Sequence, residues 1–226
     1  MSVTTFQRAR SAEQRAVRRR AILETAAAML TEMPVADLSL NELSRRVGLA
    51  KSNVLNYFES REAVLLELLG SELSAWVDAL AAAAAEIPRT AKLGPRAELL
   101  ADAVVRTLAE RPVFCDLISA QGSVLERNIS ADAALTFKQV SLTVYRRMLA
   151  LITGVLPEIG VDAATRFIKS ASILAGAIWS HAHPTASIVA AYESDPAIAD
   201  LRLDFETDLR EALQTLLYGV LPRVRA

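Results

Sequence analysis

Cysteine and histidine are nearly absent from this chain of 226 residues, which contains one cysteine and two histidines. A single cysteine, Cys115, excludes an intramolecular disulfide and any site built from paired cysteines. His181 and His183 are two residues apart, so on a helix they point to different faces, which fits a cap or an interface better than a shared metal ion. We therefore expect no metal and no cofactor, and a small core residue at Cys115.

Long apolar runs are also missing. The alanine-rich run from Asp78 to Ala85 has charges on both sides, and no stretch approaches the roughly 20 apolar residues that a membrane helix needs. The arginine-rich start lacks the apolar core of a signal peptide. We expect a cytoplasmic protein with no integral membrane segment.

Glycine and proline are scarce, at eight each, whereas apolar residues, mainly Ala, Leu and Val, make up 52% of the chain. This balance favours long helices over many short strands and predicts an all-α fold. The net charge of -1 is unevenly distributed, because residues 1–61 hold 10 Lys and Arg against six Asp and Glu, while the rest holds 15 against 20. Only the amino-terminal part is therefore suited to bind phosphate.

An amphipathic first helix is expected over residues 12–30, where apolar residues recur at helical spacing. Its stripe consists of Val17, Ile22, Ala26, Met29 and Leu30. Arginines lie before it or on its opposite face, namely Arg8, Arg10, Arg15, Arg18, Arg19 and Arg20. Pro34 disfavours continuation of this helix.

Two short helices joined by a tight turn follow. Ser39 with Glu42 three residues later forms a capping box, which starts a second helix over residues 40–47. Gly48 ends it, because glycine enters the left-handed conformation without a side-chain clash. A third helix is expected over residues 50–57. The pair forms a helix-turn-helix, whose inner face is expected to hold Leu40, Leu43, Val47, Leu49, Val54 and Phe58.

Polar residues on the third helix are the candidates for contact with DNA. They are Lys51, Ser52, Asn53 and Asn56. An Asn amide pairs bidentately with adenine, so Asn53 and Asn56 are expected to recognise bases, while Lys51 reaches guanine or phosphate. Ser39 at the start of the second helix, Tyr57 and Arg61 are expected to contact the phosphate backbone.

The run LSLNELSRRVGLAKSNVLNYFESREAVL, residues 38–65, resembles the DNA-binding region of TetR-family regulators, and Tyr57-Phe58 followed by Ser60-Arg61-Glu62 is its most specific element. The resemblance implies an all-helical homodimer, a double-stranded DNA operator with two half-sites, and a carboxy-terminal domain whose small-molecule effector changes the spacing of the two DNA-binding heads. Leu55 departs from the aromatic residue often found at its position. The basic arm resembles extensions that enter an adjacent minor groove, and a solvated tail is the alternative.

The remaining chain predicts a larger helical domain, with the division placed between residues 1–65 and 66–226. Its expected helices are residues 95–110, 113–121, 131–156, 162–182 and 201–221. Aromatic and apolar residues there either line an effector cavity or are ordinary core. These candidates are Trp76, Phe114, Ile118, Phe137, Tyr145, Met148 and Trp179.

Two apolar stripes on the last long helices are candidates for dimerisation. One consists of Leu201, Phe205, Leu209, Leu213, Leu216, Leu217 and Val220, and the other of Ile173, Leu174, Ala177 and Ile178. Resemblance to the family implies a four-helix interface between subunits here. The small residues Ala171, Ala175 and Gly176 would let these helices approach one another closely. Burial of the stripes within one chain is the alternative.

The function predicted from the sequence is therefore a sequence-specific transcriptional regulator, released from a palindromic operator as a repressor by a ligand. A helical ligand-binding or scaffold protein without DNA binding is the alternative. We do not expect an enzyme, since the sequence presents no glycine-rich phosphate loop and no Ser, His and acid set.

Overall fold

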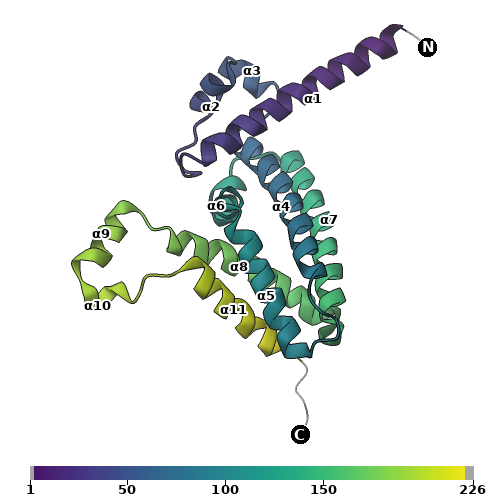
Figure 1. The fold of residues 1–226 in the computed structure, drawn as a ribbon. Coiled ribbons are helices and arrows are strands. Elements are labelled where there is room, and N and C mark those ends of the chain that lie inside the picture. The colour runs from purple at the N-terminus through teal and green to yellow at the C-terminus, as the bar shows by residue number, and fades with distance from the viewer. Residues whose placement is uncertain (1–2, 222–226) are drawn as a thin grey trace. The chain divides into compact units, whose positions relative to one another are not determined.

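A computed structural model describes residues 3–221, and the side chains of residues 13–221. Within residues 3–221 the secondary structure is entirely helical (Figure 1), as the composition predicts. The elements are α1 (Val3–Leu30), α2 (Leu40–Val47), α3 (Lys51–Leu55), α4 (Arg61–Ala85), α5 (Leu93–Ala109), α6 (Pro112–Ala120), the π-helix η1 (Gln121–Leu125), α7 (Ala131–Val155), the 3-10 helix η2 (Pro157–Ile159), α8 (Gly160–Ala182), α9 (Ala186–Ser194), α10 (Pro196–Ala199) and α11 (Phe205–Val220).

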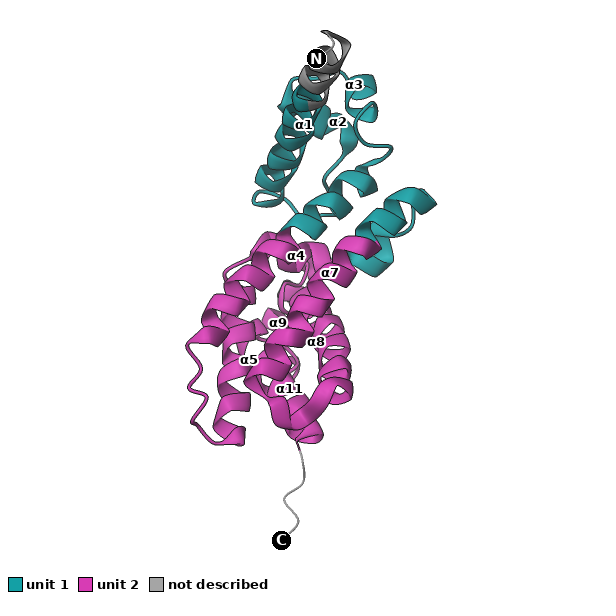
Figure 2. Ribbon diagram, turned by 90° about the vertical axis from the view of Figure 1, so that its right-hand side faces the viewer, with its two compact units in different colours: residues 1–71, 120–137 teal, residues 72–119, 138–226 magenta. Residues whose placement is uncertain are grey.

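The chain divides into two compact units, coloured separately in Figure 2. Unit 1 comprises Met1–Ser71 with Ala120–Phe137, and unit 2 comprises Glu72–Ser119 with Lys138–Ala226. Both α4 and α7 therefore contribute residues to each unit. The expected division between residues 65 and 66 stays a prediction.

Unit 1 is built on the second half of α1. Ile22, Ala26 and Met29 are fully buried, as the predicted stripe requires. Two expectations were wrong: α1 begins at Val3 instead of residue 12, and Val17 is 61% exposed. The first half of α1 extends past α2 and α3 (Figure 1). Val17 lines an open groove beside α3, which explains its exposure. The backbone of the basic arm is therefore helical, while the side chains of Arg8 and Arg10 lie outside the described residues.

In unit 2, α11 packs against α5 and α8. The α11 stripe lies inside this single chain, with four buried residues, Phe205, Leu209, Leu213 and Leu217. These four residues follow the burial alternative, while Leu216 and Val220 are half-buried. Leu201 was wrongly placed in this stripe, since it is 68% exposed. It precedes α11, which begins after Asp204; the Asp204 side chain caps the helix by accepting a hydrogen bond from the Thr207 N–H at 2.9 Å.

Two small residues of α8 also face inward. Ala175 and Gly176 are buried, and a Cβ atom built on Gly176 would lie 3.2 Å from the carbonyl oxygen of Ile118 on α6. Gly176 therefore permits close packing of α8 on α6 within one chain, which corrects the expected approach between subunits. Ile173, by contrast, is 73% exposed.

Two helices were missed by the sequence analysis, α9 and α10, which lie between α8 and the last helix. Figure 1 shows them standing off to one side of α5, α8 and α11. No residue of α9 or α10, both of which the structure describes throughout, is buried.

Arg96 fixes the start of α5 to the junction of α7 and α8. Its guanidinium is buried and donates to the carbonyl oxygens of Ala91 at 3.0 Å and Val155 at 2.6 Å, and it pairs with Glu158. This arginine therefore satisfies carbonyls at a sharp bend, where α7 and the following Pro157–Ala182 meet at 103°.

The two helices at this bend have the length and apolar composition of a membrane span only when they are taken together. Among the residues that the structure describes, no single helix is long and apolar enough to cross a membrane.

Candidate nucleic-acid interface

The two ends of α2 are fixed by local chemistry. The Ser39 side chain accepts a hydrogen bond from the Glu42 N–H at 3.2 Å. Gly48 has a φ of 71°, in the left-handed region, and its N–H donates to the carbonyls of Arg45 and Ser44. Both features confirm the predicted bounds of this helix. The chain then turns directly into α3.

The short helix α3 buries one side and exposes the other. Val54 is fully buried, while the polar candidates are all exposed, namely Lys51, Ser52, Asn53 and Asn56. Of the expected inner face, Leu43, Val54 and Phe58 are buried, and Leu40, Val47 and Leu49 are half-buried. The polar row predicted from the sequence is thus presented away from the core.

Two arginines of α1 hold the end of α3, a role that the sequence analysis missed. Arg15 donates to the carbonyl oxygen of Asn56 at 2.9 Å, with its guanidinium 5.5 Å from the centre of the Tyr57 ring. Arg19 donates to the Tyr57 carbonyl, pairs with Glu67 of α4, and lies 4.1 Å from the centre of the Phe58 ring. Cations at a helix carboxyl end stabilise its free carbonyls.

This contact also accounts for the length of α3. The helix was expected to reach residue 57 but ends at Leu55, where Asn56 forms the carboxy-terminal cap. The next carbonyls bind the arginines of α1 instead of continuing a helical ladder. The spacing of four residues between Arg15 and Arg19 places both on one helix face, and it was the signal available in the sequence.

An open groove of about 980 Å³ lies between α1 and α3. Its lining includes Asn53, Asn56 and Tyr57 from the α3 side and Arg15 and Arg18 from α1. Three predicted site residues are therefore brought together with basic residues from a distant part of the chain. Such a surface offers amides for base edges beside guanidinium groups for phosphates.

Arg61 lies in a different place from the α3 residues. Its guanidinium donates to the carbonyl oxygens of Ala36 at 3.3 Å and Leu38 at 3.0 Å, and it pairs with Glu62 at 3.0 Å. Arg61 therefore holds the loop that precedes Ser39. Its phosphate contact stays a prediction, but the group already has protein partners.

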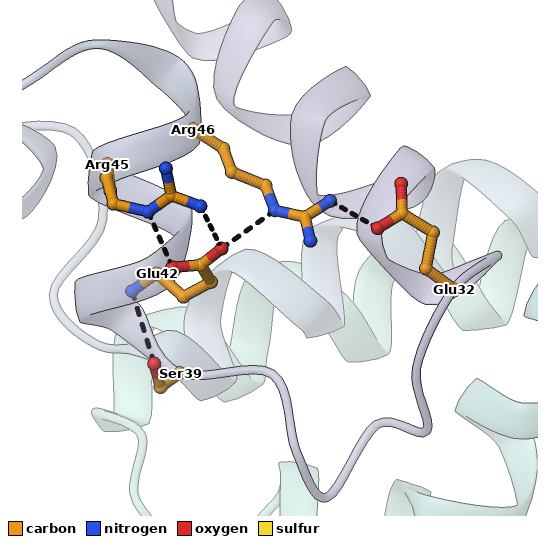
Figure 3. A network of polar contacts seen from close by, with 5 residues as sticks. All are labelled: Glu32, Ser39, Glu42, Arg45 and Arg46. Atoms are coloured by element: carbon orange, nitrogen blue, oxygen red, sulfur yellow. Dashed lines mark hydrogen bonds and ion pairs between the residues drawn. The ribbon is translucent and has the colours of Figure 1, made fainter.

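A polar network on α2 connects that helix to the end of α1 (Figure 3). Glu42 accepts from Arg45 at 2.6 Å and from Arg46 at 3.0 Å, and Arg46 also reaches Glu32 at 2.6 Å. Hydrogen bonds from Arg45 and then Arg46 lower the pKa of Glu42 to about 2. The Arg45 side chain remains 72% exposed, so it is available to a phosphate.

Comparison with known proteins identifies the family. The family described as "Tetracyclin repressor-like, C-terminal domain" matches residues 70–224, and that described as "Bacterial regulatory proteins, tetR family" matches residues 22–68. The chain belongs to the TetR family. It is accordingly a DNA-binding transcriptional regulator, and the family is not one of enzymes.

Individual proteins are similar to this TetR-family chain over part of its sequence or in fold. The HTH-type transcriptional regulator EthR of Mycobacterium tuberculosis (strain CDC 1551 / Oshkosh) is 45% identical over 49 residues, which are 22% of this chain and 23% of EthR. A possible TetR family regulator from Streptomyces coelicolor A3(2) has a TM-score of 0.60 at 16% identity, covering 89% of this chain and 97% of that one. The fatty acid degradation regulator FadR from Bacillus halodurans has a TM-score of 0.55 at 15% identity, covering 90% and 99%. The two structures show a shared fold.

Several effector candidates of this TetR-family chain have partners within the chain. Trp76 and Phe114 stack with ring centres 5.6 Å apart, and the Trp76 Nε1 donates to the Thr107 hydroxyl at 3.0 Å. Both rings are buried, as is Met148. The Tyr145 hydroxyl lies 2.8 Å from that of Thr165. Satisfied polar groups and close stacking are typical of core packing.

Phe137, Ile118 and Trp179 are the remaining candidates. Phe137 is buried in unit 1, and Ile118 is half-buried on α6. Trp179 packs edge-on against Phe205 at 4.9 Å and against His183 at 3.8 Å, but its buried Nε1 has no hydrogen-bond partner among the described residues. His183 thus packs on an aromatic ring and contacts the Trp179 carbonyl at 3.0 Å. Burial raises the pKa of Cys115 to about 12, consistent with an inert core thiol.

Proposed function

We propose that this TetR-family regulator is a homodimeric repressor that binds a palindromic operator and is released by a small-molecule ligand. The observation that carries the proposal is the exposed polar row of α3 on a firmly held support. Ser39 and Gly48 fix α2, and Arg15 and Arg19 fix the end of α3. A support of this kind delivers side chains to the major groove at a defined angle.

Asn53 and Asn56 are assigned to base recognition. Both are exposed and line the groove between α1 and α3. Arg15 holds the backbone carbonyl of Asn56, so the side-chain amide of Asn56 projects from a fixed position. A bidentate pair of an Asn amide with adenine contributes about 1–3 kcal/mol of discrimination.

Phosphate contacts are assigned to exposed cations and to polar groups around the same face. They are Ser39, Lys51 and Tyr57, which the sequence already suggested, together with Ser52, Arg18 and Arg45. Contacts of this kind supply affinity that falls with salt and is independent of sequence. Arg61 is reassigned as a positioning residue for the loop before α2.

The test of DNA recognition is selection of bound duplexes from a random pool. A near-palindromic site is expected, and recovery of no enriched sequence at moderate salt overturns the proposal. Asn53→Ala should relax base preference at defined positions. Asn41→Ala, the same chemical change at an exposed position on α2, is the matched control and should leave the preference unchanged.

Trp179 supports a ligand site in unit 2, since a buried donor without a partner is satisfied when a ligand supplies an acceptor. Metabolites that release the selected duplex should lose potency against Trp179→Phe, which keeps the ring and removes the donor. Trp76→Phe is the matched control, because the Trp76 Nε1 already binds Thr107. Equal potency against both variants removes Trp179 from the site.

A further inference from the structure

Leu55 is an exposed apolar side chain on a helix whose other exposed residues are polar. It is the last residue of α3 and is 42% exposed. Val54 and Phe58, at 0% and 3% exposure, attach this part of the chain to the core, so the Leu55 side chain is not the one that anchors α3. The exposed residues around it are Lys51, Ser52, Asn53 and Asn56. A single exposed leucine is ordinary on a protein surface, but this one lies on the surface assigned to DNA.

The exposed residues of α3 form two rows. Asn53 and Asn56 are three positions apart, and both line the groove beside α1. Leu55 is four positions from Lys51, and the described lining of that groove includes neither of these two. At 3.6 residues per turn, Leu55 lies about 160° around the helix from Asn53. Leu55 is therefore on the flank of α3 opposite Asn53.

The backbone at Leu55 is held on both sides. Val54 before it is fully buried, and the carbonyl of Asn56 after it accepts a hydrogen bond from Arg15 at 2.9 Å. Arg19 donates to the next carbonyl, that of Tyr57. A leucine side chain loses less conformational entropy on making a contact than a long polar side chain does. Leu55 is thus an apolar group presented in a fixed position.

The major groove of DNA contains one apolar group that distinguishes a base. Thymine carries a C5-methyl group there, whereas adenine, guanine and cytosine are distinguished by hydrogen-bond donors and acceptors. In an A·T pair this methyl group belongs to the strand opposite the adenine N6 and N7 that an Asn amide binds. A helix that turns one flank toward the adenine therefore turns its other flank toward the strand with the thymine.

We propose that Leu55 recognises the C5-methyl group of a thymine in each half-site of the operator, on the strand opposite the adenine that Asn53 binds. The inference rests on the proposed function, which places α3 in the major groove, and it adds an apolar base contact to the two amides. Burial of one methyl group against Leu55 should strengthen binding about fourfold per half-site.

Replacement of thymine by deoxyuridine in the selected duplex is the direct test, because it removes the methyl group and keeps every hydrogen-bonding group of the base. Each thymine is replaced in turn in one half-site, and affinity for the full chain is measured at a fixed salt concentration. The wild type should lose affinity about fourfold at one thymine. Leu55→Ala should bind the thymine and deoxyuridine duplexes equally at that position.

Two further variants separate this contact from a general effect of substitution. Leu135→Ala is the matched control, since Leu135 is 57% exposed on α7 in the same compact unit. This variant should retain the wild-type sensitivity to deoxyuridine. Leu55→Met keeps an apolar side chain of similar volume and should retain the sensitivity as well.

Two results overturn the proposal. An enriched site in which the wild type is sensitive to deoxyuridine at no thymine shows that no methyl group is recognised, and this result needs no variant. Equal losses for the wild type and Leu55→Ala at the sensitive thymine show that another residue recognises the methyl group. Both results are obtained on an enriched site and leave the proposed function standing, whereas selection that enriches no sequence removes the proposed function itself.

Discussion

Replacing Gly176 by alanine has two opposing effects on the free energy of unfolding. Alanine favours a helix interior over glycine by about 0.8–1.0 kcal/mol, so the change stabilises α8 locally. The added Cβ, however, would meet the Ile118 carbonyl oxygen at 3.2 Å and the Ser119 Cα at 3.3 Å. Both are backbone atoms of α6, which is anchored by buried neighbours and cannot rotate aside as a side chain would.

Overpacking of this kind costs about 1–3 kcal/mol. The sum predicts that Gly176→Ala lowers the free energy of unfolding by about 1 kcal/mol, with the packing cost outweighing the helix gain. With a urea slope of about 2 kcal/mol per molar, the unfolding midpoint should fall by about 0.5 M. The two tryptophans of the chain, Trp76 and Trp179, both lie in unit 2, so their fluorescence reports this transition.

Gly154→Ala is the matched control. Gly154 is also helical, in α7, but a Cβ there meets only the end of the Arg89 side chain, at 3.9 Å. This substitution should raise the midpoint or leave it unchanged. A Gly176→Ala protein more stable than the wild type would show that α6 yields readily, and the reasoning from close packing would be wrong.

Three further predictions follow from the polar contacts. Arg61→Ala should weaken DNA binding without changing its salt dependence, because Arg61 holds a loop; a salt slope reduced by about one per head would instead indicate a phosphate contact. Arg96→Met should lower the free energy of unfolding, measured by urea titration, by about 3 kcal/mol, because it leaves buried carbonyls unpaired. Glu158→Gln, at the exposed end of the ion pair, should lower it by less than about 1 kcal/mol. The stability contributed by Glu42 should be fully present above pH 4.5 and lost as the pH falls through about 2, since its folded pKa is lowered; NMR titration of a Glu42 carboxyl at its ordinary pKa would show that the pairs with the two arginines do not form.

Features that depend on a few neighbouring residues were predictable from the sequence. The Ser39 cap and the Gly48 turn each involve residues within four positions. Their energetics are local, so a single sequence contains them. The exposed row of α3 followed from the same local pattern.

Features that depend on distant residues were not predictable in this way. Arg15 and Arg19 looked like part of a basic arm because their acceptors, the carbonyls after α3, lie about 40 positions away. Gly176 looked like a site for close approach between subunits, yet the helix that fills this space is α6 of the same chain. An amphipathic stripe shows that a face is buried, and it does not show against what.

The proposed dimer changes how DNA-binding measurements on this chain should be interpreted, because each substitution would be present in both DNA-binding heads. A base contact of Asn53 worth about 1–3 kcal/mol becomes about 2–6 kcal/mol on a palindrome, or about 30-fold to 20,000-fold in affinity. On a duplex with one half-site only one head binds. Asn53→Ala should therefore reduce the logarithm of full-site affinity by twice the loss on a half-site.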